Sequence, residues 1–370
     1  MTGGSNLKEL LIACATAIEG EDRSMKADAM LEELRKSVSV SAGEPLQRLG
    51  AYMVEGLAAR LACKKPKGRE TSTEQIMYDK ETLYEACCPY FKGGYGAANA
   101  AIIEAVERQD KVHIIDFRIS AGHQWVHIIR ALSKRVGGPP TIRITGIDDS
   151  VPAYARGSML EQTSMRLRFS AVKFGVPMEF HAVAISGEQV EEGHLAVVPG
   201  EALVVNFNLG LHCIPEDHRD RILRLVKSLS PKVVTLVEQE LDTSTGPFMQ
   251  RDDDNMWDEY YYFYSIVSES MDLRVGIDRI RMEQHGLSRE VVNLVAREGA
   301  EMVERHHLFV KWKARLMMAG FTLLPLSSKV CGTIRKRLQV YGPNYLCDER
   351  DGALYLGCKD KPLVVTSAWH

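Results

Sequence analysis

Five short runs of apolar residues, separated by stretches with helical periodicity, limit what this chain can fold into. They lie at Val112–Phe117, Thr141–Ile147, Met178–Ala184, Ala202–Asn208 and Lys232–Glu238. Runs this short and this apolar are typical of strands buried on both faces of a sheet. Strands that alternate with helices predict an α/β core, in which helices cover both faces of a mostly parallel sheet.

The two ends of the chain follow other patterns. Apolar residues recur at helical spacing through residues 6–63 and again in a tyrosine-rich segment, Tyr260–Met271. The last two apolar runs, Ala353–Cys358 and Leu363–Trp369, flank a charged turn and predict a hairpin that completes the edge of the sheet. We expect an α-helical cap from residues of about 1–80 and 250–275, and an α/β core from residues of about 81–249 and 276–370. This outline is Rossmann-like and, in its topology, methyltransferase-like.

The composition of the chain argues against several classes of protein. The chain has 46 lysine and arginine residues against 49 aspartate and glutamate residues, so it lacks the strongly basic character of an autonomous nucleic-acid binder. None of its eight cysteines forms a CxxC pair, which argues against a zinc site or a disulfide framework. No apolar stretch approaches the ~20 residues of a spanning helix, and the first residues lack a secretory signal. We expect an intracellular protein with no membrane partner.

The order of motifs along the whole chain resembles the plant GRAS family of transcriptional regulators. The leucine-rich start is similar to the family's first leucine-rich region, and VHIIDF at Val112–Phe117 is similar to its VHIID motif. A PFYRE region is represented by Pro247-Phe248, Phe263-Tyr264, Arg279 and Glu283; REGAEMVERHH ends at His307, and SAWH ends the chain. GGPPTIRITGIDD and SLSPKVVTLVEQE are most similar to the scarecrow-like branch associated with phytochrome-A signalling. The resemblance assigns structural roles to Val112, His113, Asp116, Arg279, Glu283, Trp312 and Trp369.

The resemblance implies a single GRAS domain over residues 1–370. It implies a non-enzymatic nuclear transcription regulator, with the cytoplasm left open as a second location. Such a regulator would act in plant development or signalling as a scaffold for DNA-binding factors and other regulators, as a homodimer or a heterodimer with another family member. The chain departs from the family at Cys358, where an aromatic residue is usual, and over Asp252–Trp257.

A cofactor in a Rossmann-like sheet would bind where the strands end. The candidate residues are Asp116 after the first strand, Gly122 at the next helix start, and Asp148, beside Asp149, after the second strand. A dinucleotide or S-adenosylmethionine loop needs closely spaced glycines so that the backbone can approach the ligand. Between Asp116 and Gly122 there is no further glycine, and Arg118 adds a bulky cation. We predict a vestigial pocket without a cofactor; an S-adenosylmethionine-dependent methyltransferase is the alternative.

No catalytic constellation stands out in the sequence. The GxSxG motif is absent, and His113 lies in a buried strand, where a histidine is more often a hydrogen-bonded core residue. His212-Cys213 and His306-His307 lack partners at metal-ligand spacing. We predict no catalytic residue and no metal, and we interpret Trp312 and Trp369 as core anchors.

Two groups of residues are candidates for protein binding. Leu7, Leu10 and Leu11 form an LxxLL sequence, the spacing by which a helix presents leucines to a groove. Tyr260, Tyr261 and Tyr264 belong to a tyrosine cluster that also contains Tyr262, and such clusters favour interfaces. For the leucines, the alternative is packing inside this protein's own helical cap. Some of the tyrosines must face inward at helical spacing, so only part of that cluster can form a surface.

Three basic runs are candidates for contacts with DNA. Arg335-Lys336-Arg337 and Arg219–Arg224 could contact phosphates, and Lys64–Arg69 could also be a nuclear import signal. The alternative is a solvated helix face or loop. We expect DNA contact to be weak or indirect; direct DNA binding through a basic groove, within one chain or across a dimer, is the competing hypothesis.

Overall fold

The computed structural model describes residues 3–19, 23–40, 44–63, 88–148, 153–243, 255–272, 283–296 and 304–370. The chain forms two compact units, each built from two stretches of sequence. Unit 1 comprises Met1–Cys88 and Thr243–Glu304, and unit 2 comprises Pro89–Asp242 and Arg305–His370. Predictions made for Lys64–Arg69, Asp149, Pro247-Phe248, the side chains of Asp252–Trp257, and Arg279 fall outside the described residues.

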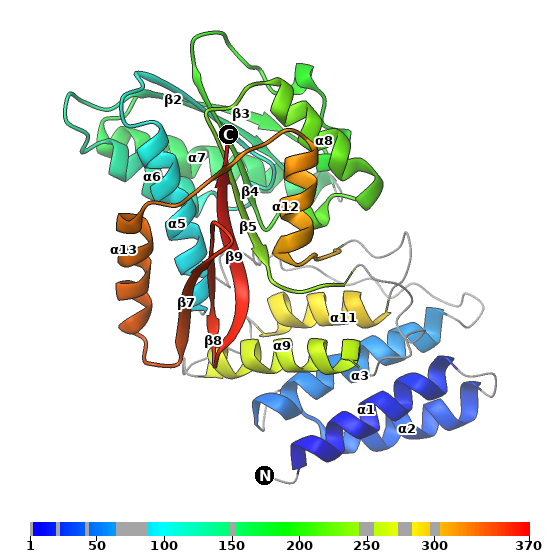
Figure 1. The fold of residues 1–370 in the computed structure, drawn as a ribbon. Helices are drawn as coiled ribbons and strands as arrows, with labels where there is room; N and C mark the ends of the chain where they lie inside the picture. Colours follow the sequence, from blue (N-terminus) through cyan, green and yellow to red (C-terminus); the bar gives the residue numbers. More distant parts are fainter. Residues whose placement is uncertain are drawn as a thin grey trace. The chain divides into compact units, whose positions relative to one another are not determined.

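Unit 1 is helical (Figure 1). Its elements are α1 (Gly3–Glu19), α2 (Arg23–Ser37), α3 (Pro45–Cys63), α9 (Asn255–Asp272), the π-helical turn η4 (Glu283–Leu287) and α11 (Ser288–Ala296). The sequence-based division placed everything from residue 276 in the α/β core, whereas Glu283–Ala296 belongs to unit 1. The reason is that α11 packs closely along α3: a Cβ at Gly56 would lie 2.7 Å from the Val295 side chain.

Unit 2 contains a nine-stranded mixed sheet. Its strands are β1 (Lys111–Asp116), β2 (Thr141–Ile147), β3 (Met178–Val183), β4 (Ala202–Asn208), β5 (Val233–Gln239), β6 (Leu323–Leu324), β7 (Tyr345–Arg350), β8 (Ala353–Cys358) and β9 (Lys361–Trp369). The order is β3-β2-β1-β4-β5-β9-β8-β7, with β6 beside β9. The first five strands are parallel, and β9 runs antiparallel to β5, with Trp369 opposite Val234. The order 3-2-1-4-5 is that of a Rossmann-like sheet, which confirms the predicted fold class.

The closing hairpin does not form the edge of the sheet, so that part of the prediction was wrong. β9 lies between β5 and β8, and β7 follows as the outer strand. β8 and most of β9 are buried, whereas the charged end of β7, Asp348–Arg350, is exposed. Charged side chains are common on edge strands, where they discourage pairing with other chains.

Helices cover both faces of the sheet, as the apolar strands require. They are α5 (Pro89–Ala105), α6 (His123–Leu132), α7 (Ala153–Phe174), α8 (Glu216–Ser228), α12 (Phe309–Met318) and α13 (Ser328–Gln339). Ile114 and Val204 point to the core shared with α5, α6 and α7, while their neighbours Ile115 and Val205 point to the core shared with α8 and α12. Figure 1 shows α5 and α6 on one side of the sheet, and α8 and α12 on the other.

Trp312 on α12 and Trp369 on β9 are fully buried in the second of these cores, as predicted for core anchors. Among the described helices, none has the length and apolar character that crossing a membrane requires.

Candidate functional site

Polar side chains gather at the carboxyl ends of the parallel strands, where ligands of Rossmann-like folds bind. Asp116, the last residue of β1, is buried. Its Oδ2 accepts a hydrogen bond from Trp125 Nε1 (2.6 Å), and its Oδ1 accepts one from the backbone N–H of Arg118 (3.1 Å). Burial disfavours the charged carboxylate and raises the pKa of Asp116 from its ordinary value of 3.8 to about 6. Both carboxylate oxygens are thus held by the loop and helix that follow β1.

Arg118 crosses from the β1 loop to the segment after β4. Its Nη1 donates to the backbone oxygen of Leu209 (2.8 Å) and to the sulfur of Cys213. The approach is tight, because a Cβ at Gly210 would lie 3.2 Å from Arg118 Cβ. The side chain therefore spans two neighbouring strand ends, the position that a bound cofactor would need.

Gly122 is the N-cap residue of α6 and has a φ of +68°, a conformation that favours glycine. A Cβ here would lie 2.7 Å from Cγ2 of Thr163, whose hydroxyl donates to the backbone oxygen of Ser120 (2.7 Å). This glycine allows α7 to pack against the β1 loop. The third candidate, Asp148, follows the neighbouring strand β2 and is half-buried. The structure thus brings the three predicted pocket residues to one edge, where internal contacts hold Asp116 and Gly122.

A network of amides continues this edge, and the sequence analysis missed it. Asn206 and Asn208 on β4 both donate to Oε1 of Gln124 (3.2 and 3.0 Å), and Gln124 donates to Oδ1 of Asn99 (2.9 Å). The hydroxyl of Thr235 on β5 donates to Oδ1 of Asn206 (2.8 Å). Two asparagines inside an apolar run were the only signal in the sequence.

A second buried polar cluster lies at the end of β5. Glu238 Oε1 accepts the backbone N–H groups of Leu211 and His212 (2.9 and 3.2 Å), and its Oε2 is 2.6 Å from Nδ1 of His212. The His212 ring stacks on His306 at 4.2 Å between centroids. Burial raises the pKa of Glu238 from 4.5 to about 7. The fold therefore brings Glu238 and His306 next to His212, although they lie 26 and 94 positions away in the sequence.

His212, Glu238 and His306 each offer a ligand atom, and these atoms lie within 4.8 Å of one another. Histidine and glutamate are the ligand types that zinc accepts. The carboxylate, however, already accepts two backbone N–H groups, and Arg219 donates to the backbone oxygen of His212 (2.8 Å). Since the guanidinium brings positive charge beside the cluster, we interpret it as a structural hydrogen-bonded cluster.

Comparison with known proteins decides the family. The family model of the GRAS domain family matches residues 7–370. This chain belongs to the GRAS family. Chitin-inducible gibberellin-responsive protein 2 of Oryza sativa subsp. japonica is 58% identical, with 99% of this chain and 68% of the relative covered. Scarecrow-like transcription factor PAT1 of Arabidopsis thaliana is 49% identical, with 98% and 76% covered.

The crystal structure of SCL7 from Oryza sativa is similar over 98% of this chain and 99% of that one, with 31% identity and a TM-score of 0.82. The scarecrow-like GRAS membership and the fold predicted from the sequence are thereby confirmed. The membership supports a role in the regulation of transcription.

The GRAS motifs have structural roles in unit 2. Val112 is buried in β1, and His113 beside it is buried with Nε2 2.8 Å from the hydroxyl of Thr145. Burial lowers the pKa of His113 to about 4, so its imidazole is neutral at physiological pH. This matches the interpretation of His113 as a core histidine.

The PFYRE glutamate, Glu283, holds unit 1 together through a buried ion pair. Arg48 on α3 donates to both of its carboxylate oxygens, from Nε to Oε2 (2.9 Å) and from Nη2 to Oε1 (3.0 Å). A second arginine of α3, Arg60, lies 2.5 Å from Oε1 of Glu19 on α1. Two arginines on one helix thus fix segments that are distant in sequence.

The residues predicted to bind proteins are mostly buried, and that prediction needs correction. Leu7 and Leu11 are buried among the helices of unit 1, and only Leu10 of the LxxLL sequence is exposed. The alternative of internal packing holds for these two leucines, because α1 packs on α2 and α3.

The tyrosine cluster behaves in the same way. Tyr260, Tyr261 and Tyr264 are buried, and Tyr262 is the exposed member of the group. The hydroxyl of Tyr264 donates to Oε1 of Glu290 on α11 (2.8 Å). Burial, together with the carboxylate of Glu290, raises the pKa of Tyr264 well above its ordinary value. These rings are part of the core of unit 1.

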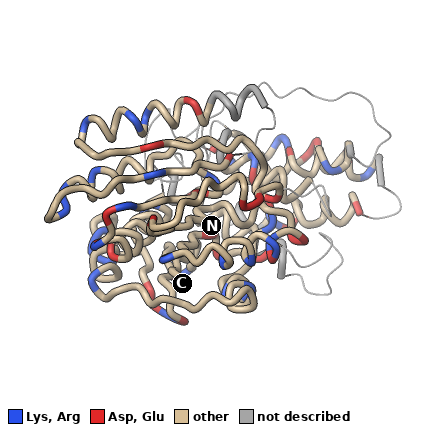
Figure 2. Tube along the Cα trace, turned by 90° about the horizontal axis from the view of Figure 1, so that it is seen from above, with Lys and Arg blue, Asp and Glu red and all other residues tan. Residues whose placement is uncertain are grey.

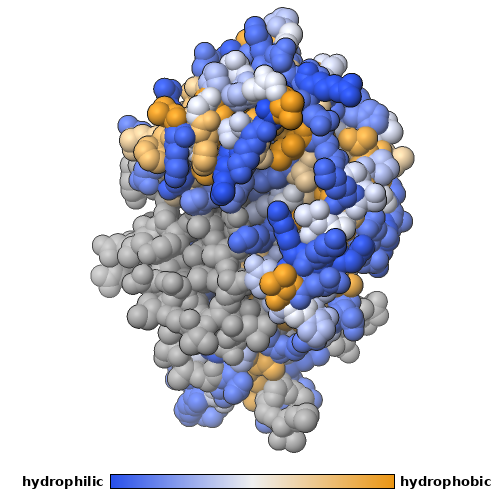
Figure 3. Space-filling model, turned by 90° about the vertical axis from the view of Figure 1, so that its left-hand side faces the viewer, coloured by the Kyte–Doolittle hydropathy of each residue, from blue (hydrophilic) through white to orange (hydrophobic). Residues whose placement is uncertain are grey.

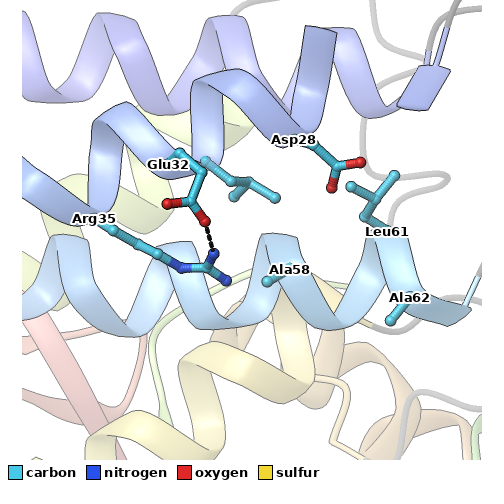
Figure 4. Close-up of a pocket in the computed structure, with 7 residues that line it drawn as sticks. Asp28, Glu32, Arg35, Ala58, Leu61 and Ala62 are labelled. Carbon is cyan, nitrogen blue, oxygen red and sulfur yellow. Dashed lines mark hydrogen bonds and ion pairs between the residues drawn. The ribbon is translucent and has the colours of Figure 1, made fainter. Parts of the chain in front are cut away.

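Unit 1 also carries a small groove between α2 and α3 (Figure 4). Its volume is about 350 Å³, and it is lined by Asp28, Leu31, Glu32, Arg35, Ala58, Leu61 and Ala62. Arg35 and Glu32, one turn apart on α2, form an ion pair at 2.7 Å among the residues that line the groove. Nothing in this groove indicates a particular ligand.

The basic residues predicted to contact DNA differ in their exposure to solvent and in their ion pairs. Arg335, Lys336 and Arg337 are exposed on α13, but Arg335 pairs with Glu349 of β7 at 2.9 Å. Arg219 is fully buried, so its assignment to a DNA contact was wrong: it donates to backbone oxygens of His212, Ile214 and Arg305. Figure 2 shows basic residues interspersed with acidic ones along most of the described trace.

Proposed function

We propose that this GRAS domain acts in the nucleus as a non-enzymatic scaffold that regulates transcription by binding DNA-binding factors and other regulators. The observation that carries the proposal is that side chains at the carboxyl edge of the sheet bond to the protein itself. Asp116 is held by Trp125, and Arg118 spans the ends of β1 and β4. In this chain, side chains at the usual ligand site of Rossmann-like folds make internal contacts. We therefore assign partner binding to the outer surfaces of the domain.

A methyltransferase role is the less favoured alternative. S-adenosylmethionine requires a loop whose backbone approaches the ligand closely, and glycines make that approach sterically free. In this chain the loop after β1 carries the Arg118 side chain, and its one glycine, Gly122, faces Thr163. Both features support a protein without this cofactor.

Direct DNA binding is the stronger competitor, and Lys336 and Arg337 favour it. Both are exposed, and no ion pair involves either of them within the described part of the chain. Affinity for DNA rises with the number of phosphates that a protein neutralises, so two cations supply a weak contact. We propose that DNA contact is secondary, and that a homodimer or a heterodimer with another family member could align two such patches.

The test is a titration of the purified domain against promoter DNA at roughly physiological ionic strength, with and without a DNA-binding factor recovered from plant nuclei with the domain as bait. We expect the domain to join the DNA complex only when the factor is present. The Lys336→Ala/Arg337→Ala variant should join it nearly as well. Nanomolar, sequence-specific binding by the domain alone, abolished by neutralising Arg335, Lys336 and Arg337, would reverse the order of the two hypotheses.

A further inference from the structure

The helix α7 has apolar side chains on two faces. Its inner face contributes Leu160 and Leu167 to the core between α6 and the sheet. Its outer face carries Met165, Phe169 and Val172, which are 61%, 71% and 83% exposed. Steps of four and three residues place these side chains in one stripe along the helix. The stripe is not used by the core of unit 2.

The stripe lies beside exposed positive charge. Arg168 and Lys173 flank it on α7, Arg130 is exposed on the adjacent helix α6, and Lys134 is exposed just after the end of α6. Among the residues of these two helices whose side chains the structure describes, Glu161 is the one acid. Arg168 Nε bonds only to the hydroxyl of Ser164 (3.3 Å), and within the described residues none of these four cations lies within ion-pair distance of a carboxylate. Figure 3 shows hydrophobic patches within a hydrophilic surface on the side where α6 lies.

We propose that the outer face of α7, centred on Phe169, is a docking surface for an acidic amphipathic helix of a partner protein. The inference rests on the proposed scaffold function and names one surface and the partner chemistry for it. Met165 and Val172 are separated by seven residues, about 10 Å along the helix axis, which matches two turns of a partner helix. Helices that dock in this way use apolar anchors at i, i+3 or i+4, and i+7.

Charge complementarity selects the occupant. A helix with apolar anchors on one face and glutamates or aspartates beside them would bury Phe169 and place its carboxylates near Arg168 and Lys173, which are exposed on the same helix as Phe169. A basic helix with the same anchors would meet like charge, which opposes binding and slows association. The surface therefore discriminates between partner helices by their sign of charge.

The probe is a displayed library of helical peptides with fixed Leu, Phe or Met anchors and a free choice of Glu or Lys at the flanking positions. The intact domain is used for selection, and one selected peptide is then measured by fluorescence anisotropy. We expect glutamate to be enriched over lysine, and affinity to fall as salt rises, since salt screens the contacting charges. Phe169→Ser should weaken binding by about tenfold or more, as loss of a central aromatic anchor does.

A matched control is the Met317→Ser/Met318→Ser variant, which removes exposed apolar side chains (58% and 84%) from α12. It should bind the peptide with unchanged affinity. Enrichment without preference for glutamate, or binding that survives Met165→Ser/Phe169→Ser, would overturn the proposal. A dimer of this chain in light scattering that Phe169→Ser abolishes would also overturn the proposal. The outer face of α7 would then bind a second copy of the chain.

Failure of this inference is distinguishable from failure of the scaffold function. Recruitment to promoter DNA by a DNA-binding factor tests the scaffold function with the wild-type domain alone. If recruitment occurs and no acidic peptide is selected, the α7 surface is wrong and the scaffold function stands. If peptides are selected and recruitment is absent, the surface binds helices but the proposed function is wrong.

Discussion

The carboxyl edge of the sheet and the outer face of α7 lie in the same unit and use their side chains in opposite ways. At the edge, polar groups that a ligand could contact are bonded to the protein itself, as Asp116 is to Trp125. On α7, apolar groups that a core could use are exposed, as Phe169 is. This contrast is the basis of our proposal that the sheet serves as a rigid support and that surface helices bind partners.

Of the substitutions considered for the two regions, those at the carboxyl edge of the sheet should cause the largest loss of stability. Trp125→Ala removes a fully buried indole and the donor to Asp116, so the free energy of unfolding should fall by about 3–5 kcal/mol. Trp125→Phe retains most of the volume and loses the hydrogen bond, at a cost of about 1–3 kcal/mol. Urea denaturation of both variants measures the two contributions. Equal stability of Trp125→Phe and wild type would show that the bond to Asp116 does not matter.

The pH dependence of stability tests whether Asp116 is buried and closed off from solvent. Its pKa is raised to about 6 in the folded protein, so the folded state binds this proton more tightly than the unfolded state between about pH 4 and 6. The contribution of Asp116 to the free energy of unfolding should therefore increase as the pH falls from 6 to 4. One pKa unit corresponds to about 1.4 kcal/mol, which limits the change to a few kcal/mol.

The stability of wild type relative to Asp116→Asn isolates this contribution from other groups. His113, with a pKa lowered to about 4, acts in the opposite direction in both proteins and cancels in the difference. A difference that stays constant from pH 7 to pH 4 would mean that Asp116 is not closed off from solvent.

Glycine substitutions separate strain from close packing. Gly122→Ala places a methyl group against Thr163 at positive φ and should cost about 2–3 kcal/mol. Gly175→Ala is the matched control: its φ of +66° is nearly the same, nothing lies within 4 Å of the new Cβ, and its cost should be about 1 kcal/mol. Thermal or urea unfolding compares them. Equal costs would remove the argument that Gly122 serves the packing of α7 on the β1 loop.

The smallest effect on stability is expected on the outer face of α7. Phe169→Ser and Met165→Ser change exposed side chains, so each should alter the free energy of unfolding by no more than about 0.5 kcal/mol. A loss comparable to that of Trp125→Ala would show that the stripe packs inside the protein, and the comparison between the two regions would fail.

The sequence predicted unit 2 better than unit 1, for a physical reason. A strand buried on both faces must be apolar along its length, so Ala202–Asn208 was visible without its partners. β7 was missed because an edge strand with exposed Asp348, Glu349 and Arg350 lacks that signal. Burial of Arg48 could not be foreseen, since arginine is buried only when paired and Glu283 is 235 residues away.

The candidate site was predicted in position but not in detail. Asp116 and Gly122 followed from strand order and the rule for strand ends. The bonds of Arg118 to Leu209, and the cluster of Glu238 with His212, depend on how neighbouring strands align, which residue spacing does not show. The tyrosines of α9 were assigned to a surface because a tyrosine ring suits an interface as well as a core, and residue spacing does not show that Tyr264 has a buried partner in Glu290.

The central claim is that the carboxyl edge of the sheet is closed by the protein's own side chains and that function lies on outer surfaces. Calorimetric titration of the folded domain with millimolar S-adenosylmethionine tests this most directly, because the ligand would need the space that Arg118 spans. The account predicts no heat of binding above dilution. Saturable binding at micromolar concentration, weakened by changing Asp116 or Asp148, would contradict it and restore the edge as a ligand site.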